Sequence, residues 1–153
     1  MNKTAITHAI VEKLREEFDN FRTASKKTRS AGNDAESKSE GKYDTRSTEE
    51  NYLADGLAKQ AATIAQAAAA YEGFVAPDFA ADEPIDLGAI ILVKFPGETE
   101  WFFLGPAGGG TEISEDHLHL TVITPESPLG GYVMGKRSGD SIPELKARIV
   151  AIE

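Results

Sequence analysis

The sequence contains no cysteine and no long apolar run. Without cysteine the chain can form no disulfide, no thiolate zinc site and no cysteine nucleophile, so we expect a cytoplasmic protein in a reducing compartment. No segment approaches the ~20 apolar residues that span a bilayer, and the first residues lack the apolar core of a signal peptide. We therefore expect no membrane association.

Basic residues are outnumbered by acidic ones. The chain of 153 residues has 16 Lys and Arg against 25 Asp and Glu, which gives a net charge of −9. This balance argues against a protein that binds nucleic acid only through Lys and Arg contacts to the backbone phosphates. A positively charged protein partner, or a bound cation, fits the charge better.

Proline is absent from the first half of the chain, and all seven prolines lie from residue 77 onward. The segment 73–84 is rich in Gly and Pro, which interrupt regular structure, and reads as a boundary. We predict two domains, an antiparallel coiled-coil hairpin at 1–75 and a small β domain at 76–153.

The first region has the apolar period of helices. Two stripes recur at steps of three or four and are narrow enough to cover each other as a helical hairpin. For its turn the sequence favours Gly32, because Asn33 and Glu36 form an N-cap pattern directly after it, with Gly41 as the alternative. The stripes are Ile6, Ile10, Leu14, Phe18 and Phe21, and then Leu53, Leu57, Ala61, Ile64, Ala68 and Tyr71.

The second region has the composition of strands. Segments 85–93, 101–104 and 118–123 are rich in β-branched and aromatic residues, and 145–152 is a candidate last strand. Ser127-Pro128 predicts a helix start, with serine at the N-cap and proline at the first helical position. The fold class expected for the whole chain is α+β, with an antiparallel sheet and one short helix in the second domain.

Three carboxylates form the most informative pattern. On a helix Glu36, Glu40 and Asp44 would line one ridge, and none of them has a basic residue three or four positions away. A hard cation such as Mg²⁺ prefers oxygen ligands and often takes only one or two protein carboxylates. The ridge therefore reads either as a solvated helix face or as part of a metal site completed by a second protein.

Other candidate sites have less support. His117 and His119 alternate with leucines and would face one side of a strand, but no third metal ligand stands nearby. The glycine-rich loop 105–110 lacks the Lys-Ser/Thr pair of a phosphate-binding loop, and no nucleophile elbow is present. We expect a protein that is not an enzyme.

The segment 127–140, SPLGGYVMGKRSGD, resembles the Ser-Pro-Leu-Gly…Leu-Gly-Lys…Gly-Asp signature of the bacterial Gre transcription elongation factors. In that family the signature belongs to a C-terminal FKBP-like domain that follows a helical hairpin. The order of the two predicted regions is the same here. The segments 101–106 and 123–126 are also similar to that domain.

The resemblance implies a function and a partner. Gre factors dock on RNA polymerase and pass the coiled coil down its secondary channel, where acidic tip residues help to hold a Mg²⁺ of the active centre and the polymerase cleaves the transcript. By this resemblance the tip is Glu36, Glu40 and Asp44, with Leu129, Lys136 and Arg137 near the docking surface. We expect a monomer that binds no cofactor stably, shares Mg²⁺ with RNA polymerase and meets nucleic acid only through the elongation complex.

The sequence departs from the family at two places. The usual tip run Asp-Leu-Ser-Glu-Asn-Ala-Glu-Tyr is absent, and Gly131-Tyr132 replaces a basic-Ala pair in the signature. Three alternatives therefore stay open at this point. The chain could occlude the channel as an inhibitor, act as an FKBP-like prolyl isomerase or chaperone, or serve as a coiled-coil adaptor that dimerises.

Overall fold

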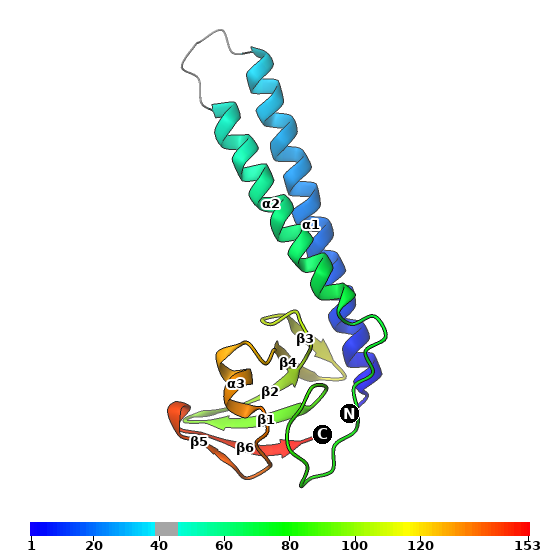
Figure 1. Cartoon of the computed structure of the whole chain (residues 1–153), viewed down its shortest axis with the longest axis vertical. Helices are drawn as coiled ribbons and strands as arrows, with labels where there is room; N and C mark the ends of the chain where they lie inside the picture. The colour runs from blue at the N-terminus through cyan, green and yellow to red at the C-terminus, as the bar shows by residue number, and fades with distance from the viewer. Residues whose placement is uncertain (39–45) are drawn as a thin grey trace. The chain divides into compact units, whose positions relative to one another are not determined.

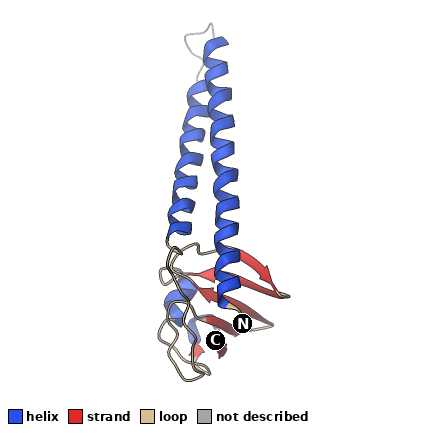
Figure 2. Cartoon of the chain, turned by 90° about the vertical axis from the view of Figure 1, so that its right-hand side faces the viewer, coloured by secondary structure: helices blue, strands red, loops and turns tan. Residues whose placement is uncertain are grey.

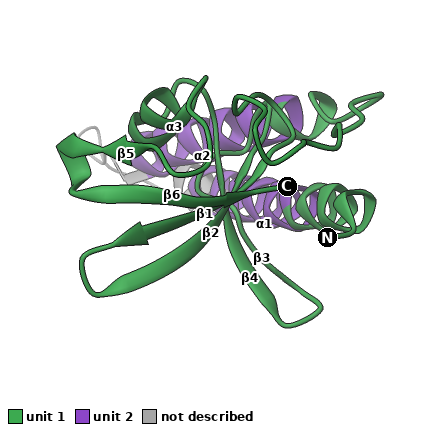
Figure 3. Cartoon of the chain, turned by 90° about the horizontal axis from the view of Figure 1, so that it is seen from below, with its two compact units in different colours: residues 1–13, 67–153 green, residues 14–66 purple. Residues whose placement is uncertain are grey.

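The structure is a computed structural model that describes residues 1–38 and 46–153, with side chains at 1–33 and 47–153. Two compact units make up the chain (Figure 3). One unit is residues 14–66, and the other combines residues 1–13 with residues 67–153. The first turns of the N-terminal helix therefore group with the C-terminal part of the chain. The predicted domain boundary between residues 75 and 76 stays a prediction.

Two long helices form the first part of the chain (Figures 1 and 2). Helix α1 runs from Lys3 to Lys38 and α2 from Arg46 to Ala69, and the two lie side by side and antiparallel within the 14–66 unit. The predicted helical pair is confirmed. Among the described residues, neither helix has a stretch long and apolar enough to cross a membrane.

The predicted turn at Gly32 is wrong, because α1 continues through this residue to Lys38. Gly32 is instead buried against α2. A Cβ at this position would stand 3.2 Å from the carbonyl oxygen of Ser47 and 3.0 Å from the Oδ1 atom of Asn51. Glycine allows the two helix backbones to approach closely here. The alternative turn residue, Gly41, lies outside the described residues.

The buried stripe of α1 extends further than its apolar residues. Leu14 is 2% exposed, and the buried stripe continues through Ser25 and, seven residues later, Gly32 toward the end of the helix. The Ser25 hydroxyl donates a buried hydrogen bond of 2.8 Å to the carbonyl oxygen of Ala54. Small residues therefore hold the two helices together where large apolar ones are missing.

The stripe of α2 is confirmed from Leu57 onward and differs at its first residue. Leu53 is 57% exposed, whereas Ala54 is fully buried. Steps of four and three residues back from Tyr71 arrive at Ala54, so the helix phase turns Leu53 outward. Its neighbour Tyr52 is 73% exposed.

The C-terminal part is a six-stranded mixed sheet with one short helix, α3 (Pro128–Val133). The strand order is β3-β4-β2-β1-β6-β5. All neighbours pair antiparallel except β2 and β4, which run parallel. The sheet is therefore mixed, whereas the sequence predicts a purely antiparallel one. The strands are β1 (Ile90–Phe95), β2 (Glu98–Leu104), β3 (Glu112–Glu115), β4 (Leu118–Ile123), β5 (Ser141–Ile142) and β6 (Ala147–Ile152), and a short 3₁₀ helix, Pro143–Leu145, joins the last two.

One hydrophobic core includes residues of the sheet and α3. Val93, Leu104 and Ile149 are fully buried in it, together with Val133 of α3. Phe103 is also fully buried, so this ring of β2 serves packing. The expected small sheet domain with one short helix is confirmed.

Candidate functional site

The predicted acidic residues lie between the last turns of α1 and the start of α2 in the sequence. Helix α1 ends at Lys38 and α2 begins at Arg46. Glu36 belongs to the last turns of α1, but its side chain is not described, and Glu40 and Asp44 lie outside the described residues. The acidic site therefore stays a prediction.

The chemistry of this donor set suits Mg²⁺. Carboxylate oxygens are the ligands that Mg²⁺ prefers, and a site with few protein ligands leaves positions for water or for phosphate oxygens. The residues that the structure describes contain no group of three or more His, Asp or Glu side chains able to hold a metal ion.

The Ser-Pro-Leu-Gly motif forms the start of α3. Ser127 is the N-cap: its Oγ accepts a hydrogen bond of 3.2 Å from the Gly130 amide and donates one of 2.7 Å to the carbonyl oxygen of Thr124. Pro128 occupies the first turn, where no amide donor is needed. Gly130 is required because a Cβ there would stand 1.8 Å from the Thr124 oxygen. Serine, proline and glycine of this motif are thus explained by local geometry.

The predicted docking residues lie on and after α3. Leu129 is half-buried and packs against the core, so its side chain anchors the helix. The Lys136 carbonyl accepts a hydrogen bond of 2.7 Å from the Ile85 amide, which fixes this part of the chain against the segment before β1. The Lys136 side chain is partly exposed. Their role in docking stays a prediction.

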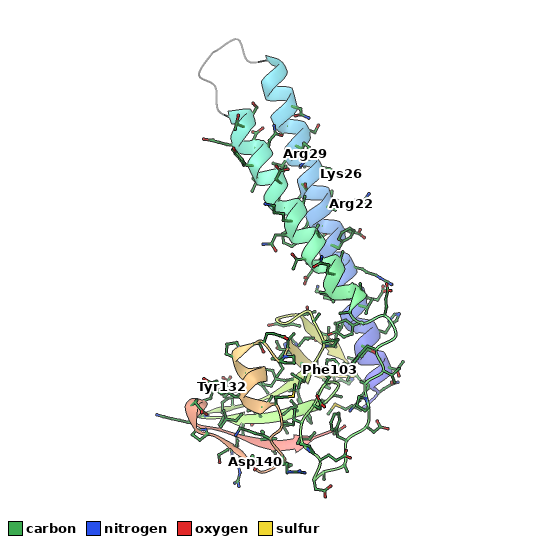
Figure 4. The ribbon with its side chains drawn as sticks, in the orientation of Figure 1. Arg22, Lys26, Arg29, Phe103, Tyr132 and Asp140 are labelled. Carbon is green, nitrogen blue, oxygen red and sulfur yellow. The ribbon has the colours of Figure 1, made fainter. Side chains whose placement is uncertain are left out.

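Arg137 is exposed, and two hydrogen bonds hold it in place. Its guanidinium donates a hydrogen bond to the carbonyl oxygen of Asp82, and its backbone amide donates one of 2.8 Å to the Asp140 carboxylate. Tyr132 of α3 is 36% exposed, and Figure 4 labels it together with Asp140. Tyr132 gives α3 an exposed aromatic ring, and Arg137, after the helix, is held by both its side chain and its amide.

Sequence reasoning missed a row of basic residues on α1. Arg22, Lys26 and Arg29 are spaced along this helix (Figure 4), and Arg29 forms an exposed ion pair with Asp55 of α2. Arg22 and Lys26 line a cavity of about 300 Å³ within the 14–66 unit. The available signal was the stretch 20–33, which has four basic residues and no acidic one.

The two histidines do not share a strand face. His117 lies in the tight turn between β3 and β4 with φ = 67°, whereas His119 is in β4, so the predicted common face is wrong. The His119 Nδ1 atom lies 3.1 Å from the Ser114 Oγ, and its Nε2 lies 4.0 Å from a Glu112 oxygen. The His119 and Glu112 side chains are 64% and 67% exposed, so water screens their interaction. Serine lies at Nδ1 and the carboxylate at Nε2, the reverse of a catalytic triad, so this exposed group is a surface contact of the β3–β4 pair.

Comparisons with known proteins gave matches among solved structures. No protein-family model matches the chain, and no curated protein matches it. The chain is similar to the GreA factor homolog 1 (Gfh1) protein of Thermus thermophilus, with 22% identity over 95% of both chains and a TM-score of 0.36. Gfh1 of Thermus aquaticus matches with 20% identity over 95% of both chains and a TM-score of 0.34.

Proposed function

We propose that this chain is a transcription elongation factor of Gre type, which binds RNA polymerase at the secondary channel and acts at the active centre through an acidic tip. The segment 127–140 carries this proposal. It resembles the Gre signature in sequence, apart from Gly131-Tyr132, and within it Ser127 and Gly130 have the local roles that such a motif requires. It also follows a helical pair in the chain, as in that family.

The helical pair supports the proposal because two packed helices can form a stiff arm. Its seam of buried residues continues to Gly32, and the Ser25–Ala54 hydrogen bond joins the helices along the way. Paired helices resist bending better than a single one, because each buries the other's apolar stripe. A stiff arm of this kind is suited to carrying side chains into a narrow channel.

The chemistry proposed for the tip is electrostatic. Glu36, Glu40 and Asp44 would hold a Mg²⁺ ion shared with the polymerase, which when bound supplies an activated water for phosphodiester hydrolysis. The chain contributes oxygen ligands and no nucleophile of its own. Its part is to bring negative charge to a cation that is held elsewhere.

The prolyl isomerase alternative has less support. Such an enzyme needs an open pocket lined by aromatic rings. Phe102 and Phe103 are 6% and 0% exposed, so both rings serve the packing of the sheet. We therefore prefer the polymerase-binding function.

The experiment is a transcript-cleavage assay on purified backtracked elongation complexes, with and without the full chain. A Gre-type factor changes the cleavage rate, upward if it stimulates the polymerase and downward if it occludes the channel. Binding to the polymerase is measured in parallel by gel filtration. A chain that neither binds the polymerase nor changes the cleavage rate would overturn the proposal.

A further inference from the structure

A pocket on the sheet gathers most of the basic charge of the C-terminal part. Residues 81–153 contain five Lys and Arg against twelve Asp and Glu, yet three of the five line one pocket, and none of the twelve does. The pocket has a volume of about 480 Å³, within the range of small-molecule sites. Its basic residues are Lys94, Lys146 and Arg148.

The strand register brings two of these cations directly opposite each other. Lys94 of β1 pairs with Arg148 of β6, and Arg148 pairs on its other side with Ser141 of β5. Opposed residues of an antiparallel pair point to the same face, and like charges in this arrangement repel. The register thus places two like charges next to each other in the lining of this pocket.

No carboxylate of the described residues relieves this repulsion. The side chains of Lys94 and Lys146 form no hydrogen bond or ion pair within the part of the chain that the structure describes, and both residues are exposed. Arg148 uses its Nε to donate a hydrogen bond of 2.8 Å to the Gly139 carbonyl, which fixes the guanidinium and leaves its two terminal nitrogens available. Lys146 is held at the end of the 3₁₀ helix with φ = 52°, an uncommon conformation for a residue other than glycine.

The rest of the lining is apolar or neutral. Phe95, Pro96 and Pro143 border the cations, and the Ser141 hydroxyl adds a hydrogen-bond donor. A group that satisfies three cations must carry more than one negative charge, which a phosphate monoester or polyphosphate does and a single carboxylate does not. The Phe95 ring and the two proline rings beside the cations offer an apolar contact for the organic part of the same ligand.

We propose that this pocket binds a small organic phosphate. Lys94, Lys146 and Arg148 hold the phosphoryl oxygens, and the organic part lies against Phe95. The bound anion removes the repulsion between Lys94 and Arg148. This site does not depend on polymerase binding and would operate in the free protein.

The test uses the full chain and magnesium-free ATP as the probe, measured by isothermal titration calorimetry at fixed salt. We expect one saturable site, weaker binding of inorganic tripolyphosphate, and no binding of adenosine. Lys94→Gln/Arg148→Gln should weaken ATP binding about tenfold or more, since it removes two charge-assisted contacts. The control Arg22→Gln/Lys26→Gln removes the same charge from α1 and should leave the affinity unchanged.

Three results would overturn the proposal: no saturable ATP binding, an equal loss in the control variant, or tripolyphosphate binding as tightly as ATP. A second readout does not need a ligand. Because Lys94→Gln relieves the repulsion with Arg148, it should raise the thermal midpoint of the free protein and reduce the increase that ATP produces. A lower midpoint for this variant would show that the two cations are not in conflict.

Discussion

Gly130 lies directly against the carbonyl oxygen of Thr124, so closely that a Cβ at residue 130 would stand 1.8 Å from that oxygen. The contact belongs to the turn that the Ser127 hydroxyl closes before α3. The next residue, Gly131, has much more room, since a Cβ there would lie 3.6 Å from the Pro125 oxygen. Adjacent glycines thus have different structural roles.

Gly130→Ala should therefore destabilise the sheet part by about 3 kcal/mol, because the backbone of the turn must move. Gly131→Ala is the matched control and should stay within about 1 kcal/mol of the parent, on the stabilising side. Urea unfolding followed by tryptophan fluorescence measures both, since Trp101 lies in β2. Equal stability of the two variants would contradict the close contact.

Glycines in the helical pair allow a similar comparison. Gly32→Leu should destabilise the pair by about 1–3 kcal/mol, because the side chain meets Ser47 and Asn51. A Cβ at Gly56 would have no atom within 4 Å, so Gly56→Leu should stabilise α2 by about 0.5–1 kcal/mol. Circular dichroism at 222 nm during thermal unfolding gives both shifts. A stabilising Gly32→Leu would mean that the helices do not approach closely at this residue.

The helical pair shows which buried residues an apolar pattern predicts and which it misses. The apolar stripe predicted Ile10 and Leu14, which are 0% and 2% exposed. It did not predict the seam at Ser25 and Gly32, because small residues pack two backbones together without being hydrophobic. The same limitation led the sequence to favour a turn at Gly32, where glycine serves close packing.

The sheet was predictable in composition and less so in pairing. The apolar segments containing β1, β2 and β4 stand out in the sequence, whereas β3 has two glutamates among its four residues and gives no such signal. The parallel pairing of β2 with β4 depends on contacts distant in the chain. The pocket at Lys94 and Arg148 was missed for the same reason, because only the β1–β6 register brings these residues together.

Tyr71 predicts a dependence of stability on alkaline pH. Its hydroxyl donates a hydrogen bond of 2.8 Å to the Ala107 carbonyl, and burial raises the pKa of this hydroxyl well above its ordinary value. Above pH ~10 the unfolded chain loses this proton while the folded chain keeps it, so stability falls as the pH rises.

Tyr71→Phe should lower stability by about 1 kcal/mol at neutral pH and remove this part of the alkaline decline. Urea unfolding of parent and variant between pH 8 and about 11 measures the difference, which cancels the lysines common to both. The difference in stability should shrink as the pH rises above 10. A difference that is constant with pH would contradict the proposed burial of a neutral hydroxyl.

The tip carboxylates are proposed to act at the polymerase active centre, and the rest of the function depends on this step. The most direct measurement is the cleavage rate of a backtracked transcript with the parent chain and with the triple variant Glu36→Ala, Glu40→Ala, Asp44→Ala. A matched control, Glu98→Ala/Glu100→Ala/Glu126→Ala, removes three exposed carboxylates from the sheet part. We predict that the tip variant binds the polymerase as the parent does but loses its effect on cleavage, while the control keeps it. An equal effect of the parent and the tip variant on the cleavage rate would contradict the proposed role of the tip.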